Sequence, residues 1–307
     1  MLLSARLVLS GQDVTLWTRT REQAETVCEQ GVELETVPGA AGRRIRMRAA
    51  PFADAKQGGA DLVFVTVKQT ALSEDMLRHI SYAAAPDAAL AAFQNGVGHM
   101  ERLAAALPGR ALLSAVTTEG ALRTGTASVR HTGGGDTWIG PWPEADNPRA
   151  AESMAAKRHE SAVFVKRMLK KAGFSAFLSN DIQQRILRKL LINAVINPLT
   201  AIWRVPNGQL PSSPDRLIAM QALFRETAHV LRRHGGLQGV SDEALWETVL
   251  DVCAATSANR SSMLQDVLAG RKTEVEAMNG QICRMAAAAG VPSPWNEAVT
   301  TLVKAIL

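Results

Sequence analysis

The sequence predicts an α/β protein in which a parallel sheet with crossover helices is followed by an all-helical region. Helix and strand patterns alternate along the first half of the chain, as in sheets whose parallel strands are joined by helices. Residues 60–67 form a near-continuous apolar run, which is typical of a strand buried on both faces. Beyond Asn180-Asp181 only helical patterns occur. We therefore expect a sheet domain at residues 1–179 and a helical domain at residues 180–307.

The chain opens with a predicted helix at residues 2–9, closed by Gly11, and a strand at residues 13–17 with β-branched and aromatic side chains. The next predicted elements are helices at 22–30, 72–84 and 99–106 and strands at 60–67 and 88–93. Ligands of parallel sheets gather beyond the carboxyl ends of the strands. Lys68 and Asn95 stand at two such ends, so both are candidates for ligand contacts.

The sheet domain is expected to continue through three more strands at 112–117, 128–131 and 137–139, followed by a turn at 140–143. A long helix at 151–172 and one last strand at 174–178 are expected to complete it. The helical domain is expected to contain helices at 182–204, 214–234, 242–257 and 274–289. Proline and glycine residues separate these helices, because neither residue continues a helix well.

The composition is that of a folded globular protein with mixed charge. Of its 307 residues 47% are hydrophobic, and 34 Lys and Arg against 29 Asp and Glu give a net charge of +5. This charge suits phosphate or carboxylate ligands, but it is spread along the chain. One tyrosine and seven phenylalanines offer few platforms on which bases could stack. Nucleic acid is therefore not an expected partner.

The cysteine and histidine positions indicate no disulfide framework and no metal site. Three scattered cysteines include no CxxC pair and fit a reducing cytoplasm. His99 and His131 lack partners at metal-ligand spacing, so we expect structural roles for both. No apolar run reaches the length expected of a membrane span, and the opening segment lacks a cleavage signal. We expect a cytoplasmic protein without membrane contact.

Three polar residues follow one face of the predicted helix at 182–204. Lys189, Asn193 and Asn197 are four residues apart, and each such step keeps a side chain near the same face of a helix. A lysine among leucines must reach water, meet a carboxylate or line a pocket for an anionic ligand, because a buried unpaired charge is costly. The stripe therefore indicates either a ligand pocket or a snorkelling lysine beside two interhelical asparagines.

Glu274 and the segment just before it form a second candidate group. Thr273 and Glu276 fit a capping box, so we expect Glu274 in the first turn of the last helix, where a carboxylate also complements the helix dipole. The polar segment at residues 259–263 contains Ser262 and is expected to be a loop. Its hydroxyls could bind a carboxylate or simply cap a helix.

Arg19 follows the strand at residues 13–17, where a doubly wound nucleotide-binding domain normally selects the ribose substituent. The segment Thr18-Arg19-Thr20-Arg21 contains no acid that would bind a free 2′-hydroxyl, whereas arginine can neutralise a 2′-phosphate. Arg19 therefore favours NADP over NAD, although such a turn also occurs as a solvated surface loop. Lys68 has two interpretations, a phosphate contact or a surface lysine, and the Asn95-Gly96 pair can approach a ligand or form an ordinary turn.

Taken together, the motifs resemble the ketopantoate reductase family over nearly the full chain. They are DVTLWTR, VTVKQT, FQNGVG, KLLINAVINPLTAIWRVPNG and NRSSMLQDVLAGRKTEVEAMNG, of which the last two are specific. The resemblance implies a Rossmann-like domain that carries NADPH and a helical domain that carries most substrate groups, with the chemistry in a cleft between them. It also implies the reduction of 2-dehydropantoate to pantoate in pantothenate biosynthesis.

Several residue roles are carried over from this resemblance. Lys189 corresponds to the catalytic lysine, which gives a hydrogen bond or proton to the keto oxygen, and Glu274 to a carboxylate that engages substrate and cofactor around it. The other matched positions are the substrate contacts Asn193, Asn197, Ser262 and Asn95, the cofactor contacts Arg19, Lys68 and Asn95, and the pocket supports Asn207 and Asn259. An acid is needed because the alkoxide left by hydride addition is too basic to persist.

The chain departs from the family pattern at its amino terminus. Family members begin with a strand and a GxGxxG turn, and these roughly twelve residues have no counterpart before the helix at residues 2–9. Either the natural protein starts upstream and includes the turn, or a truncated chain binds the dinucleotide poorly. The complete set of polar residues downstream favours the first explanation.

Three functions remain open from the sequence. The first is an NADPH-dependent reductase of 2-dehydropantoate or a related 2-keto acid. The second is a catalytically impaired family member that acts through dimerisation or partner binding, and a homodimer is compatible with either. The third is a hydroxyacid or sugar-phosphate dehydrogenase with the same two-domain plan and the same lysine.

Overall fold

The structure, a computed structural model, describes residues 1–36, 42–143 and 148–306. The chain forms two compact units. Unit 1 comprises Met1–Thr66, Ser73–Phe93 and Met100–Ile182, and unit 2 comprises Val67–Leu72, Gln94–His99 and Gln183–Leu307. Two short segments that directly follow strands of unit 1 therefore belong to unit 2 by their contacts. The domain division expected at residue 179 stays a prediction.

Unit 1 is built on a five-stranded sheet with the order β11-β10-β7-β6-β5. Its strands are β5 (Ala60–Val65), β6 (Ala84–Ala92), β7 (Ala111–Thr117), β10 (Asp136–Pro141) and β11 (Ser175–Leu178). The strands β5, β6 and β7 are parallel, with Phe64 opposite Ala91 and Ala91 opposite Leu113. β10 is antiparallel to β7 and parallel to β11, so the sheet is mixed. An antiparallel neighbour is possible here because strands and turns, without a crossover helix, connect β7 to β10.

Two smaller sheets complete the strands of unit 1. β1 (Thr15–Thr18) pairs in parallel with β4 (Arg48–Pro51) and does not join the five-stranded sheet among the described residues. The other sheet has the order β3-β2-β9-β8, from β2 (Val32–Glu35), β3 (Arg43–Ile45), β8 (Gly120–Arg123) and β9 (Ser128–Gly133). The expected fold, a largely parallel sheet with helices followed by an all-helical region, is confirmed, although one pair of its strands is antiparallel and two small sheets accompany it. The strands β2, β3, β4 and β8 span three or four residues, too short for a periodic signal.

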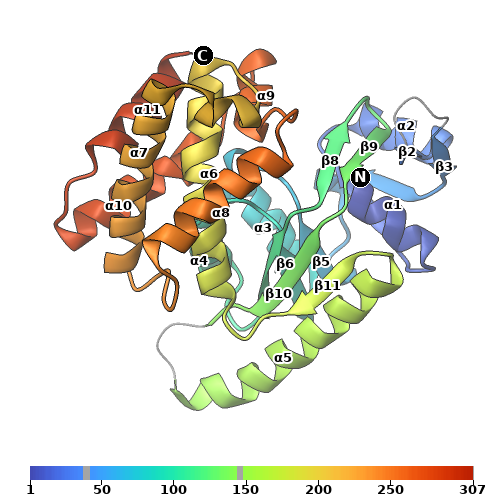
Figure 1. Ribbon diagram of the computed structural model, residues 1–307. Helices are drawn as coiled ribbons and strands as arrows, with labels where there is room; N and C mark the ends of the chain where they lie inside the picture. Colours follow the sequence, from blue (N-terminus) through green and yellow to red (C-terminus); the bar gives the residue numbers. More distant parts are fainter. Residues whose placement is uncertain (37–41, 144–147, 307) are drawn as a thin grey trace. The chain divides into compact units, whose positions relative to one another are not determined.

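The helices of unit 1 agree closely with their sequence patterns. They are α1 (Leu2–Leu9), α2 (Arg21–Gln30), α3 (Glu74–Ala83), α4 (His99–Ala106) and α5 (Pro148–Lys171). Thr20 and Ser73 cap the N-termini of α2 and α3, because their hydroxyls accept hydrogen bonds from the backbone N–H groups of Gln23 and Met76. α5 runs along the sheet and packs against β7, β10 and β11 (Figure 1).

The α-helices of unit 2 number six among its described residues. They are α6 (Ile182–Trp203), α7 (Pro214–Arg233), α8 (Asp242–Ala255), α9 (Ser262–Leu268), α10 (Asn279–Ala289) and α11 (Pro294–Ala305). The predictions for α6, α7 and α8 are confirmed to within two residues at each end. The sequence patterns indicated neither α9 nor α11 as separate helices.

The predicted start of the helix at residues 274–289 is wrong. A 3₁₀-helix, η4 (Val275–Ala277), follows Glu274, and α10 begins only at Asn279. Met278, with φ −114° and ψ −91°, lies between the two helices and interrupts helical geometry. No side chain caps η4 or α10, so the capping box expected from Thr273 and Glu276 does not form. Glu274 is the residue before η4 instead.

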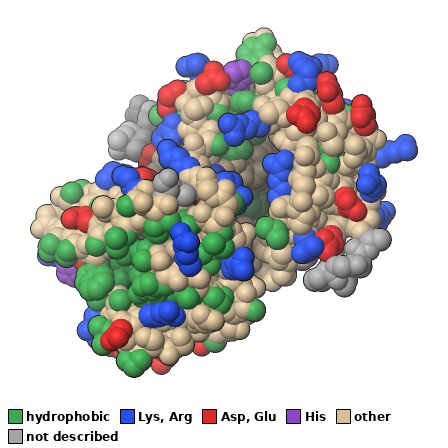
Figure 2. Space-filling view, turned by 90° about the horizontal axis from the view of Figure 1, so that it is seen from above, with side chains coloured by type: hydrophobic (Ala, Val, Ile, Leu, Met, Phe, Trp, Pro, Cys, Tyr) green, Lys and Arg blue, Asp and Glu red, His purple; other side chains and the backbone are tan. Residues whose placement is uncertain are grey.

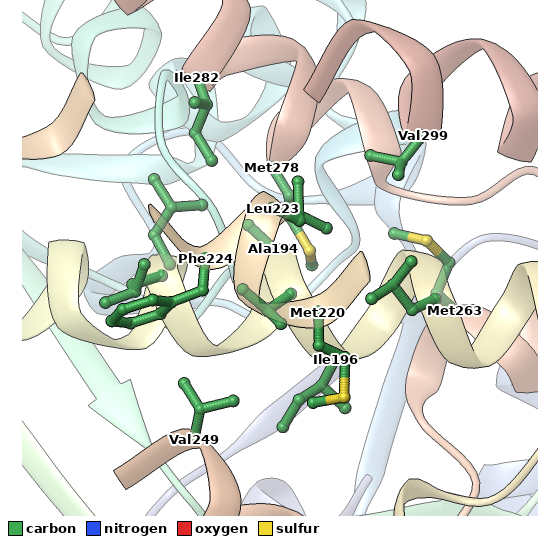
Figure 3. Packing of buried hydrophobic residues seen from close by; sticks show 14 of the residues in the cluster. Ala194, Ile196, Met220, Leu223, Phe224, Val249, Met263, Met278, Ile282 and Val299 are labelled. Carbon is green, nitrogen blue, oxygen red and sulfur yellow. The ribbon is translucent and has the colours of Figure 1, made fainter. Parts of the chain in front are cut away.

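α6 lies at the centre of the apolar core of unit 2. Its residues Ala194 and Ile196 belong to one core cluster with Leu223 of α7, Ile282 of α10 and Met278, which lies just before α10 (Figure 3). By length and composition α6 could cross a membrane, contrary to our expectation that no segment would, but 67% of its apolar window is buried within the structure. Such burial is typical of the core helix of a globular protein. On the face drawn in Figure 2, cationic and anionic side chains are interspersed.

Candidate functional site

Lys189 is the cation around which the candidate site is built. It lies on α6 at four-residue spacing from Asn193 and Asn197, so the predicted stripe is present on a regular helix. The Lys189 side chain is half-buried. Its removal from water lowers the pKa of its ammonium group to about 8, and the negative charge of Glu274 acts in the opposite direction. Lys189 therefore exchanges a proton far more readily near neutral pH than an exposed lysine does.

Glu274 is the carboxylate whose negative charge acts on Lys189. It is 7% exposed, and its Oε1 accepts a hydrogen bond of 2.8 Å from the backbone N–H of Gln69. Burial raises the pKa of Glu274, while this hydrogen bond and the charges of Lys68 and Lys189 lower it and the charge of Asp266 raises it. The net direction is upward, so Glu274 holds a proton at higher pH than an exposed glutamate. A lysine and a glutamate are thus shifted toward each other in pKa.

Lys68 belongs to a segment of unit 2, Val67–Leu72, that follows strand β5. Its ammonium Nζ contacts both carboxylate oxygens of Asp266 on α9, at 2.6 and 2.5 Å. The Asp266 side chain is 3% exposed, and Arg271 also donates to its Oδ1 at 3.1 Å. Buried carboxylates are stable only when paired in this way. Lys68 therefore anchors its segment on α9, in addition to any contact with a ligand.

Asn95 belongs to the other segment of this kind, Gln94–His99, which follows strand β6. The N–H of Val97 donates to the carbonyl of Ala277 on η4 at 3.2 Å. Gly96 has φ +79°, and a Cβ atom there would lie 2.2 Å from the same carbonyl oxygen. Only glycine permits this approach, since other residues rarely adopt such a φ and would clash. The Asn95-Gly96 turn is thus held against the segment that carries Glu274.

The remaining predicted substrate contacts divide into buried and accessible groups. Asn193 is half-buried, whereas Asn197 is 7% exposed and its Nδ2 lies 3.6 Å from the sulfur of Met278. Ser262 is exposed in the first turn of α9. Its neighbour Ser261 supplies the cap, accepting from the N–H of Leu264 at 3.0 Å. Of the two roles left open for these hydroxyls, Ser261 therefore has the capping role and the Ser262 hydroxyl is not used in this way.

Asn207 has the contacts of a structural support. Its Nδ2 donates to the Thr256 hydroxyl at 2.8 Å, and its backbone N–H donates to the carbonyl of Asn259 at 2.9 Å. These bonds tie the start of η3 (Asn207–Ser212) to the end of α8.

Arg19 belongs to unit 1 and lies directly after β1. It is exposed, and no ion pair involving it is found among the described residues. Arg21, two residues on, is paired with Asp54 at 2.6 Å. The cationic group at the carboxyl end of β1 that can receive an anionic ligand without breaking an ion pair is therefore Arg19.

We call the candidate residues of unit 2, together with the residues bonded to them, the cluster. No sequence pattern indicated two of its residues as part of the site. Gln69 binds Glu274 through its backbone, and Asp266 binds Lys68, yet both lie within the motifs as ordinary polar residues. Only the folded chain brings them to the site.

The cluster in unit 2 can act as a proton donor beside an anionic or carbonyl ligand. Lys189 offers an ammonium proton with a lowered pKa, and Glu274 offers a carboxyl group with a raised pKa. Groups whose environments shift their pKa values toward neutrality are suited to general acid and base catalysis.

Family models cover most of the chain. The model described as "Ketopantoate reductase PanE/ApbA" matches residues 1–144, and the model described as "Ketopantoate reductase PanE/ApbA C terminal" matches residues 181–307. The 2-dehydropantoate 2-reductase of Bacillus subtilis is 30% identical over 99% of this chain and 93% of its own length.

Solved structures share the fold. A ketopantoate reductase of this family from Ralstonia eutropha has a TM-score of 0.83 at 25% identity, over 99% of this chain and 93% of that one. A D-mandelate dehydrogenase solved with NADH and anilino(oxo)acetate has a TM-score of 0.85 at 22% identity, over 99% and 94% of the two chains. The second likeness concerns the fold alone.

Proposed function

The chain belongs to the ketopantoate reductase family, and we propose that it reduces 2-dehydropantoate to pantoate with NADPH as the reductant. The observation that carries the proposal is that Lys189 and the buried Glu274 of unit 2 act on each other by charge, and that burial shifts their pKa values toward each other. This arrangement provides the acid that carbonyl reduction requires. The names of the relatives support the reaction and the substrate class.

A nicotinamide dinucleotide supplies a hydride to the keto carbon when it is bound. Arg19 fits the 2′-phosphate end of such a group, because it offers an exposed guanidinium at the carboxyl end of β1. The NADH-containing D-mandelate dehydrogenase of the same fold supports the cofactor class. The choice of NADPH over NADH rests on Arg19 and on the absence of an acidic residue beside it.

In the proposed mechanism Lys189 is the general acid. As the keto carbon gains a hydride, its oxygen gains negative charge, and the Lys189 ammonium Nζ gives this oxygen a proton and becomes a neutral amine. With a pKa of about 8, the ammonium is largely protonated at neutral pH and yet gives up its proton more readily than an exposed lysine. The negative charge of Glu274, which acts on Lys189, stabilises the ammonium, and its raised pKa suits it to restore the proton of the amine.

The polar residues near Lys189 hold the substrate in this proposal. Asn193 and Asn197 lie on the same face of α6 as Lys189, and their amides bind the hydroxyl and keto groups of the substrate. The exposed hydroxyl of Ser262 binds the carboxylate of the substrate. Asn95 binds the substrate from the Asn95-Gly96 turn, which is bonded to η4.

The test is a steady-state assay of NADPH oxidation with 2-dehydropantoate. We expect turnover that saturates with the keto acid and a product that is identified as pantoate by mass spectrometry. Pyruvate and a 2-keto acid with an aromatic side chain serve as competitors for the substrate assignment. A chain that oxidises NADPH only with another 2-keto acid would correct the substrate, and a folded chain without turnover on any of them would reject the proposed reductase.

A further inference from the structure

Gln69 joins two segments of the cluster through three different hydrogen bonds. Its backbone N–H donates to Glu274 Oε1 at 2.8 Å. Its side-chain Nε2 lies 2.5 Å from the carbonyl oxygen of Asn95 and 3.0 Å from Nδ1 of His99. Gln69 thus contacts both the Glu274 carboxylate and the segment Gln94–His99.

These contacts determine which nitrogen of His99 carries the proton. A carbonyl oxygen can only accept, so the Gln69 group beside Asn95 is the NH₂ of its amide and not the oxygen. The same NH₂ therefore donates its second hydrogen to Nδ1 of His99. Nδ1 is then an acceptor, and the proton of the neutral ring is on Nε2.

The surroundings of His99 keep the ring neutral. His99 is 2% exposed, and burial lowers its pKa to about 4. Its Nε2 is buried without a hydrogen-bond partner among the described residues, as are both amide atoms of Gln94. Buried polar atoms without a protein partner are usually satisfied by ordered water or by a ligand. The two bonds from the Gln69 side chain and the bond from the Val97 N–H to the Ala277 carbonyl hold the segment 94–99.

Gly96 makes the approach of Gln69 possible. A Cβ atom at Gly96 would lie 3.1 Å from Gln69 Nε2, closer than most side-chain contacts allow. The amide of Gln69 therefore packs directly on the backbone of the Asn95-Gly96 turn. Its position and that of the turn depend on each other.

We propose that Gln69 is a positioning residue, whose side-chain amide holds the Asn95 carbonyl and selects the Nε2–H tautomer of His99. Through these bonds it sets the backbone from which Asn95 reaches the substrate. This consequence for substrate binding rests on the proposed function, whereas the tautomer of His99 does not.

The first test is the ring tautomer, which needs no activity. Protein labelled with ¹⁵N-histidine gives long-range proton–nitrogen spectra, and a His99→Asn variant assigns the His99 signals among six histidines. In the wild-type chain we expect the proton on Nε2. In Gln69→Glu the carboxylate can only accept a hydrogen bond, so the proton should move to Nδ1. In Gln69→Met, which has similar length but no donor, we expect signals of a tautomer mixture.

The second test is kinetic. In Gln69→Met the backbone bond to Glu274 is retained, so kcat should stay within about twofold, while KM for the keto acid should rise about five- to tenfold, as for the loss of one hydrogen bond. Gln209→Met, at an exposed glutamine of the same unit, is the matched control and should leave KM and the His99 signals unchanged.

The outcomes separate this proposal from the proposed function. Unchanged His99 signals in both folded Gln69 variants, or an unchanged KM in Gln69→Met, would overturn the positioning role. If Gln69→Met does not fold, Gln69→Glu decides by the position of the ring proton. An inactive wild-type chain whose His99 proton still moves in Gln69→Glu would reject the reductase and retain the Gln69–His99 contact.

Discussion

At the scale of single residues, the feature that matters most is the half-buried side chain of Lys189. An exposed lysine has a pKa of about 10.4 and is a poor proton donor near neutral pH. Burial on α6 lowers the pKa of Lys189 to about 8, and the opposing charge of Glu274 prevents a larger shift. The same desolvation that is unfavourable for folding thus makes the ammonium a better acid.

Removing this group should abolish chemistry without unfolding the protein. Lys189→Ala is expected to lower kcat by at least about a hundredfold, in the range that general acids contribute, with little change in melting temperature. Lys304→Ala, at an exposed lysine paired with Glu276 in the same unit, is the matched control. A large loss of thermal stability with retained turnover would show that Lys189 is structural.

The lowered pKa also predicts a pH dependence. The active form of a general acid is protonated, so kcat/KM should fall as pH rises through the pKa of Lys189, at about pH 8, by roughly tenfold per unit above it. The folded-state pKa lies below the unfolded value of 10.5, so the unfolded chain binds more protons between about pH 8 and 10.5. The free energy of unfolding contributed by this group therefore rises with pH over that window.

A profile of kcat/KM measured from pH 6 to 10 checks the predicted loss of activity above pH 8. A wild-type profile that stays flat through pH 8 and 9 would remove Lys189 from the role of proton donor. Urea unfolding of wild type and Lys189→Met at pH 7 and 10 checks the predicted change in the free energy of unfolding. The methionine variant lacks the buried charge and should be more stable than wild type at pH 7, and this difference should be smaller at pH 10.

At the scale of the elements, α6 stays helical across a proline because another helix supplies the missing hydrogen bond. Pro198 has no N–H, so the carbonyl of Ala194 loses its donor within the helix. Asn279, fully buried at the start of α10, donates to this carbonyl from its Nδ2 at 2.9 Å. The same amide donates to Asn296 on α11 at 3.0 Å. The helix that carries Lys189 is thereby tied to the C-terminal helices.

A double-mutant cycle can measure this compensation. Asn279→Leu leaves the Ala194 carbonyl buried without a donor, and we expect a loss of about 2–3 kcal/mol in the free energy of unfolding. Pro198→Ala restores the backbone N–H, so the same Asn279→Leu change should cost about 1 kcal/mol less in that background. Urea unfolding of the four proteins gives both values. Equal costs in the two backgrounds would mean that Asn279 does not act through the Ala194 carbonyl.

At the scale of the whole molecule, the candidate residues are divided between the two units. Arg19 belongs to unit 1, whereas Lys68, Asn95, Lys189 and Glu274 all belong to unit 2. Lys68 and Asn95 follow strands of unit 1 in the chain, but their segments are held by bonds to Asp266 and Ala277 of unit 2. The proposal therefore assigns cofactor selection to unit 1 and proton transfer to unit 2.

Variants of unit 1 should accordingly change cofactor preference alone. Arg19→Ala is expected to raise KM for NADPH about tenfold or more, the equivalent of about 1.5 kcal/mol for one charge-assisted hydrogen bond, and to leave KM for NADH nearly unchanged. Arg21→Ala, at an arginine already paired with Asp54, is the matched control. An equal rise in KM for NADPH and NADH in Arg19→Ala would contradict a 2′-phosphate contact. KM for the keto acid should be unchanged in both variants.

Much of the fold was predictable, and what was missed has a common physical cause. The strands β5, β6 and β7 have apolar runs and the helices α6, α7 and α8 have long periodic patterns, which depend only on which faces become buried. The three-residue strand β3 and the seven-residue helix α9 do not. Short elements have few periodic positions, and they are stabilised mainly by the neighbours with which they pair or pack.

The sequence by itself determined the stripe of Lys189, Asn193 and Asn197, because residues on one helix are related by its fixed geometry. Only the tertiary structure decided that Gln69 binds Glu274 and that Lys68 pairs with Asp266, since these partners are 205 and 198 positions apart in the chain. Contacts over such separations depend on how whole elements pack, and no local pattern of side chains encodes them.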